Sequence, residues 1–467
     1  MTTTYSSTRG GDRRRTFTDV MMAGLASDGG LFIPDIWPDL PRDMLARLAG
    51  SPYTVTASAV MAPFLDDQIS PSAFEKIVAQ TYLKGFSHSA VAPLVQIGPN
   101  AWIMELFHGP TLAFKDYALQ LLGRLFDYVL EQRGERVTIV GATSGDTGSA
   151  AIEACRHCKN VDIVILHPKG RTSEVQRRQM TTIDAANVHN IALEGSFDDC
   201  QNMVKAMFAD KPFRTDLNLS AVNSINWARV MAQIVYYVSA TLALGGPERR
   251  VTFAVPTGNF GNVYAAHAAR QMGLPVHSLI IGSNRNDILT RFFETGTMKT
   301  QAVEPSLSPS MDIQISSNFE RYLCELTGRD YDGVAKIMAS FKDTGGFTLN
   351  DALMEKARRD FTARRCDDAQ TTALMGACYA ETGYLIDPHT AVGLHAAGQV
   401  RQDPAVPIVA LACAHPAKFP DAVKAATGIT PPLPAHLADL FERKERMHAL
   451  PNDLAKVKDF IRKSVRA

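Results

Sequence analysis

A β-branched run, a glycine loop and an alanine-rich segment follow one another in Val251-Thr-Phe-Ala-Val255-Pro-Thr-Gly258-Asn-Phe-Gly261-Asn262-Val-Tyr-Ala-Ala-His-Ala-Ala269. The order predicts a strand, a loop and a helix amino terminus. Glycines at 258 and 261 let backbone N–H groups turn inward, and the helix dipole adds positive potential, so a phosphate monoester is the natural occupant. A tight turn that uses glycine only for its conformation remains an alternative. The loop has neither the GxGxxG spacing of dinucleotide-binding loops nor the GxxxxGK(S/T) spacing of NTP-binding loops. This argues against dinucleotide and NTP ligands.

A second junction of this kind follows the β-branched run Val137–Val140. Its loop reads Gly141-Ala-Thr-Ser-Gly-Asp-Thr-Gly148, and a helix is expected from Ser149 onward. Hydroxyl groups interleaved with glycines can bind a carboxylate or a second phosphate at a positive helix end. Helix capping explains any single hydroxyl or carboxylate here equally well.

Short β-branched runs alternate with alanine-rich amphipathic segments over most of the chain, which predicts an α/β fold with a parallel sheet covered on both faces. The first 95 residues lack this alternation and contain proline-rich joints, so they are expected to form a separate domain. The carboxyl end from Leu440 onward is rich in Lys and Glu, and a solvated helix is expected there. The expected strands are 137–140, 161–166, 251–255, 276–281 and 407–411.

A lysine between an aromatic residue and a carboxylate stands out in His108-Gly-Pro-Thr-Leu-Ala-Phe-Lys115-Asp116. Gly-Pro breaks regular structure, and apolar residues at helical spacing resume from Phe114 to Leu125, so Lys115 is expected at a loop-to-helix junction. Alone, such a lysine is usually a solvated cation or half of a surface salt bridge. Beside two anion-binding loops it indicates an imine-forming lysine and a cofactor with an aldehyde and one phosphate, which is pyridoxal 5'-phosphate.

Length and composition favour an enzyme that acts on a small molecule. The 467 residues are enough for two or three domains, and 48 basic residues balance 48 acidic ones, so no global field directs the protein to nucleic acid or an anionic membrane. Seven cysteines do not make a disulfide framework, and a cytoplasmic location is expected. The CxxC pair Cys155 and Cys158 is interpreted as structural, and no residues have metal-ligand spacing. The longest apolar run, Ile234–Leu244, is too short to span a membrane.

The lysine segment and both glycine loops resemble those of the threonine synthase family, pyridoxal-phosphate enzymes of fold type II whose core is similar to tryptophan synthase β. The segments Asn223-Ser-Ile-Asn-Trp-Ala-Arg229 and Ala414-His-Pro-Ala-Lys-Phe419 also resemble that family, as do Tyr5–Gly10 and Gly24–Pro34. The resemblance covers nearly the whole chain, so a transit peptide in the Arg- and Ser-rich residues 2–15 is no longer expected. It implies two parallel or mixed sheet lobes covered by helices in residues 96–467, the smaller including about 125–230, after an amino-terminal domain in 1–95.

The resemblance implies conversion of O-phospho-L-homoserine and water to L-threonine and phosphate, by γ-elimination followed by β-addition, in a monomer or homodimer. Lys115 is then the catalytic residue, and Gly258, Asn259, Phe260, Gly261 and Asn262 bind the cofactor phosphate. The family usually has Thr where this chain has Cys413, a weaker hydrogen-bonding partner for the pyridine nitrogen. The implied substrate-binding residues are Thr143, Ser144, Asp146, Thr147, Asn223, Ser224, Asn226 and Arg229.

Several alternatives remain open at this point. Arg229 lies in a helix-like segment, where a solvated or structurally paired arginine is equally expected. Cys413 is equally compatible with simple burial at a strand end. Asp387-Pro-His389-Thr is interpreted as a capped helix start, with His389 as a catalytic base the less favoured alternative. For function, the alternatives are a lyase that ends at a 2-oxo acid, a non-catalytic binding homologue, and a nucleotide-dependent enzyme.

Overall fold

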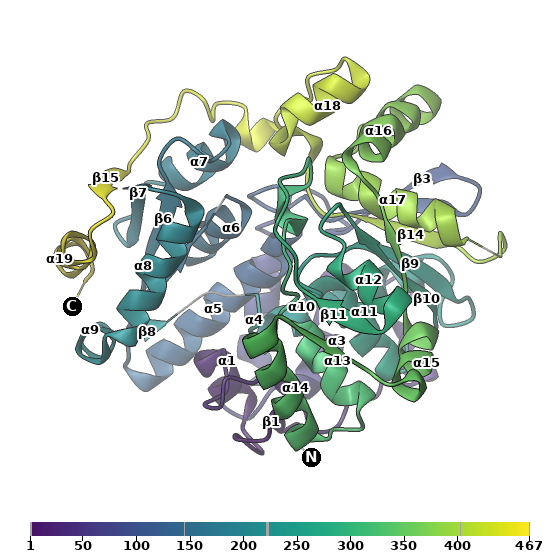
Figure 1. Ribbon diagram of the computed structural model, residues 1–467, viewed down its shortest axis with the longest axis horizontal. Coiled ribbons are helices and arrows are strands. Elements are labelled where there is room, and N and C mark those ends of the chain that lie inside the picture. The colour runs from purple at the N-terminus through teal and green to yellow at the C-terminus, as the bar shows by residue number, and fades with distance from the viewer. Residues whose placement is uncertain (1, 144, 221–223, 402, 467) are drawn as a thin grey trace. The chain divides into compact units, whose positions relative to one another are not determined.

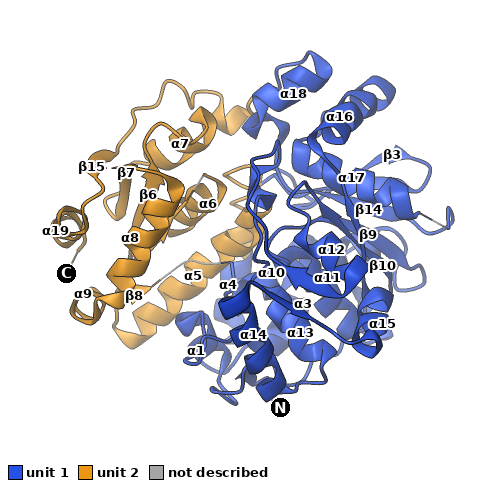
Figure 2. Cartoon of the chain, in the orientation of Figure 1, with its two compact units in different colours: residues 1–78, 87–108, 224–432 blue, residues 79–86, 109–223, 433–467 orange. Residues whose placement is uncertain are grey.

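The computed structural model describes residues 2–143, 145–220, 224–401 and 403–466. Two compact units make up the chain (Figure 2). Unit 1 contains residues 1–78, 87–108 and 224–432, and unit 2 contains 79–86, 109–223 and 433–467. Residues 1–95, expected as one domain, are therefore distributed over both units. The expected smaller lobe, about 125–230, overlaps mainly with unit 2.

Unit 1 is built on a mixed sheet with the strand order β13-β10-β9-β14-β4-β3, in which only the β3–β4 pair is antiparallel among the described residues. Its strands β10, β9, β14 and β3 are labelled in Figure 1. Two short antiparallel pairs, β1–β2 and β11–β12, lie outside it. The strands are β1 (Tyr5–Ser7), β2 (Phe32–Pro34), β3 (Leu94–Gly98), β4 (Ala101–Glu105), β9 (Val251–Pro256), β10 (Val276–Ser283), β11 (Thr297–Lys299), β12 (Gly346–Thr348), β13 (Thr362–Arg365) and β14 (Ile408–Ala412).

Helices cover both faces of this sheet. Successive residues of a strand point to opposite faces; Ala254 of β9 packs against Ala396 and Ala397, whereas the ring of its neighbour Phe253 contacts Tyr237 at a centroid distance of 4.9 Å. The helices of this unit are α1 (Phe17–Ala23), α2 (Arg42–Leu48), α3 (Tyr53–Met61), α4 (Pro71–Tyr82, which continues into unit 2), α10 (Trp227–Ala243), α11 (Gly261–Gln271), α12 (Ile288–Thr295), α13 (Phe319–Leu326), α14 (Tyr331–Thr344), α15 (Asp351–Asp360), α16 (Asp368–Thr382), α17 (Pro388–Val400) and α18 (Pro420–Thr427), with short 3-10 turns at 62–64, 309–311 and 416–418.

Unit 2 contains a parallel sheet with the order β15-β7-β6-β5-β8. One face packs on α8, α9 and α19, and the other on α5 and α6. The elements are α5 (Lys115–Arg133), β5 (Val137–Ala142), α6 (Asp146–Cys155), β6 (Val161–Pro168), α7 (Glu174–Thr181), β7 (Val188–Glu194), α8 (Phe197–Ala209), α9 (Lys211–Asp216), β8 (Leu219–Ser220), β15 (His448–Pro451) and α19 (Leu454–Ser464), with a 3-10 turn at 435–437.

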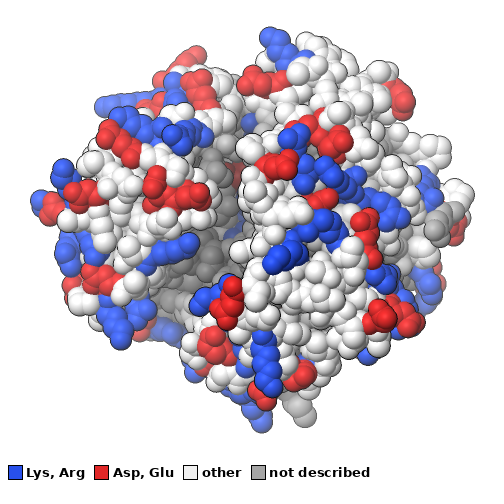
Figure 3. All heavy atoms as spheres, viewed as in Figure 1, with Lys and Arg blue, Asp and Glu red and all other residues white. Residues whose placement is uncertain are grey.

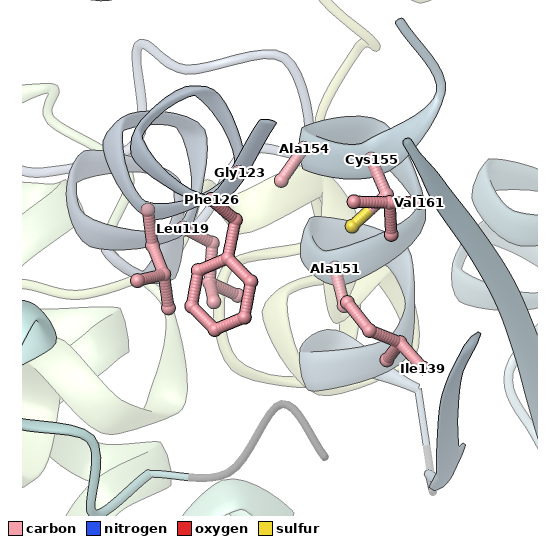
Figure 4. A pocket seen from close by; sticks show the side chains of 9 residues that line it. Leu119, Gly123, Phe126, Ile139, Ala151, Ala154, Cys155 and Val161 are labelled. Atoms are coloured by element: carbon pink, nitrogen blue, oxygen red, sulfur yellow. The ribbon is translucent and has the colours of Figure 1, made fainter. Parts of the chain in front are cut away.

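The side chains of α5 and α6 leave a small apolar hollow above β5 (Figure 4). Leu119 and Phe126 reach it from α5, and Ala154 and Cys155 from α6. Its free volume is about 10 Å³, which is close to the minimum for a single water molecule, so it is packing space and not a ligand site.

All the expected strands are present, and the parallel sheets with helices on both faces confirm the expected fold class. The expectation of a solvated carboxyl-terminal helix is wrong in one respect. The helix is present as α19, but Val457 and Ile461 are fully buried in the core of unit 2. The strand before it, β15, pairs with β7, and the apolar stripe of the helix is covered by the core of unit 2.

No helix in the described part of the chain is long and apolar enough to cross a membrane. The apolar run Ile234–Leu244 instead forms the second half of α10 and its C-cap, Leu244, and the helix is buried along nearly its full length in unit 1.

Candidate active site

In unit 2, Lys115 is the first residue of α5, at the loop-to-helix junction expected from the sequence. The neighbouring Asp116 organises the loop before it, since its carboxylate accepts hydrogen bonds from the N–H and the hydroxyl of Thr111, both at 2.8 Å. A Cβ at Gly109 would collide with Asp116, which explains the glycine at that position. Lys115 itself lies with its Nζ 3.6 Å from Asp146 Oδ2, and both side chains are largely buried.

Asp146 begins α6 and closes the loop that follows β5. Its other carboxylate oxygen accepts a hydrogen bond of 2.9 Å from Gln176. The hydroxyl oxygen of Thr143 accepts the N–H groups of Gly145 at 3.0 Å and Gly148 at 2.9 Å, so Thr143 holds the loop in shape. Thr147 lies in the first turn of α6 and is half-buried. The predicted residue Ser144 lies outside the described residues, as does Asn223.

In unit 1, the loop 258–262 follows the buried strand β9 and ends in the first turn of the helix α11. Phe260 adopts a left-handed backbone with φ of 64°, and its ring is anchored among Phe319, Phe361 and Tyr322 at centroid distances of 5.2, 5.3 and 5.9 Å. Gly261 is the first residue of α11, so N–H groups without intrahelical partners begin at this loop. This geometry fits a phosphate monoester.

The segment 310–318 supports the back of this loop. Ser316 donates to the Gly258 carbonyl at 2.6 Å, and the Asn318 N–H and side chain both donate to the Asn259 carbonyl, at 3.1 and 3.0 Å. A Cβ on Gly258 would lie 3.2 Å from Met311 Cα. Glycine at 258 is therefore needed for close approach to a second backbone.

Two tyrosines of α10 fix the side chain of Asn262. The hydroxyls of Tyr236 and Tyr237 donate to its Oδ1 at 2.5 and 2.7 Å. Because both donors bind the amide oxygen, the NH₂ group is directed to Cys413, whose Sγ accepts at 3.7 Å. Burial raises the pKa of Tyr237 well above its ordinary value, so this hydroxyl remains a donor. No sequence pattern indicates these tyrosines, which lie in an otherwise apolar run.

Arg229 lies in the first turn of α10 and is 4% exposed. Its Nε and Nη1 atoms are buried and have no hydrogen-bond partner among the described residues. Burial lowers the pKa of this guanidinium to about 10. Arg229 and Tyr236 are seven residues apart on α10 and share a helix face, so Arg229 lies on the face that contacts the loop 258–262.

The other polar residues of the segment before α10 bind the protein itself. Asn226 caps α10 by accepting the Ala228 N–H at 3.0 Å, and it donates to the Met21 carbonyl at 2.8 Å. Ser224 is half-buried, and its carbonyl accepts from Asn318 at 3.2 Å. Of the predicted substrate residues in this segment, Arg229 is the one whose side-chain donors are buried without partners in the described part of the chain.

Both ring nitrogens of His389 have hydrogen-bond partners in the protein. Asp387 caps α17, as expected, and lies 2.7 Å from His389 Nδ1, while the other nitrogen accepts the Ser310 N–H at 3.3 Å. These contacts give His389 a supporting role beside the segment 310–318. His389 as a catalytic base has no support in this geometry.

All seven cysteines are buried free thiols. A hydrogen bond with Cys155 has the largest effect on the pKa of Cys158 and, together with burial, raises it well above its ordinary value. Both features agree with structural thiols.

Each unit, taken by itself, contains groups suited to a phosphate-bearing aldehyde cofactor. Unit 2 provides a largely buried lysine at a helix start, and unit 1 provides a phosphate-sized backbone loop and a fixed amide and thiol at Asn262 and Cys413. A family model described as pyridoxal-phosphate dependent enzyme matches residues 89–413. The chain is therefore a pyridoxal-phosphate-dependent enzyme, and its fold is that of type II.

Two further family models narrow the class, one described as threonine synthase N terminus over residues 4–82 and one as threonine synthase, C-terminal over residues 390–461. The threonine synthase of Pseudomonas aeruginosa is 56% identical over 458 residues, which cover 98% of this chain and 97% of that protein. The chain belongs to the threonine synthase family.

Solved structures agree with this assignment. The crystal structure of pyridoxal-phosphate-bound threonine synthase from Brucella melitensis matches with a TM-score of 0.98 and 51% identity over 100% of both chains. Threonine synthase from yeast matches with a TM-score of 0.94 and 38% identity, over 99% of this chain and 98% of that one.

Proposed function

We propose that this chain converts O-phospho-L-homoserine and water to L-threonine and phosphate. The observation that carries the choice of substrate is the buried guanidinium of Arg229, with Nε and Nη1 unpartnered among the described residues. A buried cation without a counter-ion is costly, and a phosphate group supplies both charge and acceptors. Arg229 is therefore proposed to bind the substrate phosphate.

Lys115 is proposed to bind the cofactor aldehyde and then to move the proton of the substrate α-carbon. When bound, pyridoxal phosphate supplies an electron sink for the carbanion that forms when this proton leaves. The Lys115 side chain is 13% exposed, so its amine is largely shielded from water. Asp146, 3.6 Å away, stabilises the ammonium form after the transfer.

The loop 258–262 is proposed to hold the cofactor phosphate through backbone N–H groups and the start of α11. Cys413 is proposed to face the cofactor ring nitrogen as a neutral group. A neutral partner leaves that nitrogen largely unprotonated, whereas a carboxylate would favour its protonation. Thr143 and Asp146 shape the substrate loop, and Thr147 is proposed to contact the substrate directly.

A small polar substrate also agrees with the surface. Lys and Arg side chains are interspersed with Asp and Glu over the face shown in Figure 3. A protein that binds nucleic acid would instead concentrate basic side chains on one face. The seven free thiols support the proposed cytoplasmic location, and a monomer or homodimer is proposed on the family resemblance alone.

The test is to incubate the cofactor-loaded protein with O-phospho-L-homoserine and to quantify threonine, 2-oxobutyrate and phosphate together. Equal amounts of threonine and phosphate are expected. Phosphate matched by 2-oxobutyrate would replace the synthase with a lyase, and no phosphate release would contradict the proposed substrate.

Lys115→Ala tests the proposed role of the lysine. We expect turnover to fall at least about 1,000-fold, because both the covalent bond to the cofactor and the base are lost. Borohydride reduction followed by peptide mass spectrometry should find the cofactor on Lys115 in the unaltered protein and nowhere in the variant. Near-normal turnover in the variant would contradict this role.

A further inference from the structure

The segment Ser224–Arg229 is tied to the amino-terminal part of the chain, and all the residues concerned belong to unit 1. Asn226 is 2% exposed. Its amide NH₂ donates to the carbonyl of Met21 in α1 at 2.8 Å, while its oxygen caps α10. One side chain therefore joins the start of α10 to α1.

Arg321 makes a second tie. This arginine of α13 is fully buried, and its guanidinium donates to carbonyl or amide oxygens of three separate segments. The acceptors are the Phe32 carbonyl of β2 at 2.8 Å, the side-chain oxygen of Asn318, and the Ile225 carbonyl. Asn318 in turn donates to the Ser224 carbonyl at 3.2 Å. The carbonyls of Ser224 and Ile225 thus accept hydrogen bonds from Asn318 and Arg321, respectively.

Trp227 provides the apolar anchor of the same segment. Its ring is fully buried among Tyr5, Trp37 and Phe64, at centroid distances of 5.8, 5.8 and 5.7 Å. These three aromatic residues all come from the first 64 residues of the chain. Trp227 begins the turn that carries Arg229, so the aromatic contacts fix the angle at which α10 starts.

We infer that residues 4–64, here called the amino-terminal segment, are a scaffold that positions Arg229. Asn226 and Arg321 are its positioning residues. The inference rests on the proposed role of Arg229 in binding the substrate phosphate. A buried guanidinium binds an anion well only if its fork is already oriented, because reorienting it on binding would cost affinity. The contacts of residues 224–227 described above hold the backbone immediately before Arg229.

Asn226→Ser is the sharpest variant for this inference. Serine is a good N-cap residue, so α10 keeps its cap, but the shorter side chain cannot donate to Met21. Arg321→Lys is the second variant, since an ammonium group cannot reach all three oxygens that the guanidinium holds.

Arg329→Lys is the matched control. Arg329 also ties the amino-terminal segment, with donations to the carbonyls of Asp35 at 2.8 Å and Pro34 at 2.9 Å. No hydrogen bond joins it to Ser224–Arg229 within the described part of the chain. It therefore reports the effect of loosening the amino-terminal segment without touching the phosphate-binding segment.

Two measurements on the cofactor-loaded protein decide the inference. Amide hydrogen exchange over residues 224–232 should become at least about tenfold faster in Asn226→Ser and Arg321→Lys and stay unchanged in Arg329→Lys. Affinity for inorganic phosphate should fall about tenfold or more in the first two variants, with cofactor affinity in Asn226→Ser within threefold of the unaltered protein.

The two proposals fail in different ways. If Asn226→Ser changes exchange and phosphate affinity no more than Arg329→Lys does, the scaffold inference is overturned while the proposed function stands. If the unaltered protein binds no phosphate but exchange in the segment still rises selectively in Asn226→Ser, the role of Arg229 is contradicted and the scaffold is supported. Should Arg321→Lys not fold, Asn226→Ser alone decides.

Discussion

We expect Arg229→Met to stabilise the protein in the absence of phosphate and to weaken phosphate binding strongly. Burial lowers the pKa of Arg229 from its ordinary value of 12.5 to about 10. At about 1.4 kcal/mol for each unit of pKa, the folded state disfavours the charged form by about 3 kcal/mol. A pKa lowered on folding means that this penalty is fully present at neutral pH and is relieved only as the pH rises above about 10. Methionine removes it while filling much of the same space.

The assay is chemical denaturation at pH 7.5 in phosphate-free buffer, followed by calorimetric titration with inorganic phosphate. We expect the free energy of unfolding of Arg229→Met to equal or exceed that of the unaltered protein by up to about 3 kcal/mol. The guanidinium is expected to form two charge-assisted hydrogen bonds to phosphate, each contributing about 1.5–3 kcal/mol, so affinity should fall at least about 100-fold.

Arg321→Met is the control, because Arg321 is equally buried and its pKa is also lowered to about 10 by burial. This guanidinium has three oxygen acceptors, which would lose their donor. We expect a loss of about 3–5 kcal/mol in unfolding free energy, opposite in sign to Arg229→Met. A loss of more than about 1 kcal/mol in Arg229→Met, or retained phosphate affinity, would refute the reasoning, since Arg229 would then be a structurally paired arginine.

Three further outcomes follow from the contacts described above. Gly258→Ala should lower cofactor affinity at least about tenfold in a fluorescence titration, because the alanine Cβ would lie 3.2 Å from Met311 Cα and push the loop outward. Unchanged affinity would mean that the loop does not hold the cofactor. Ile461→Ala should cost about 2–5 kcal/mol in denaturant unfolding, since Ile461 is fully buried in the core of unit 2, whereas a solvated helix would lose almost nothing. Burial alone would raise the pKa of Glu105, but hydrogen bonds from His108 and Tyr384 outweigh burial and hold this pKa below its ordinary value. The ionised carboxylate therefore stabilises the fold above about pH 4.5. That stability is lost as the pH falls through the pKa of the folded state. Tyr384→Phe should move that acid loss of stability to higher pH, and an unchanged acid midpoint would contradict the assignment.

Periodicity and loop chemistry predicted the local elements of this chain well. The strand before Gly258, the helix after it, and the helix start at Lys115 are all present because each follows from a local pattern of β-branched, glycine or apolar residues. The predicted roles of Lys115, the loop 258–262 and Arg229 stay predictions, but the structure gives each a physical context.

Contacts between distant segments could not be predicted in the same way. Asp116 next to Lys115 suggested a salt bridge, but its carboxylate closes the loop at Thr111, and the acidic side chain near Lys115 is Asp146. The family resemblance implied that Asn226 binds the substrate, and nothing in the local sequence indicated the partners that its side chain has in the structure, Met21 and Ala228. The carboxyl-terminal helix looked solvated because composition hides an apolar stripe of two residues, Val457 and Ile461.

The same long-range contacts explain how this chain accommodates Cys413. The direction of the Asn262 amide is set by Tyr236 and Tyr237, which both bind its oxygen, and so does not depend on which residue occupies position 413. The NH₂ group therefore offers a donor at that position to either a hydroxyl or a thiol. At 3.7 Å the contact has a normal length for sulfur and would be too long for oxygen. Because the tyrosines orient the Asn262 NH₂ group, this donor points at position 413 even though a thiol is a weak acceptor. The thiol of Cys413 therefore stays oriented, and the proposed neutral contact to the cofactor ring is retained.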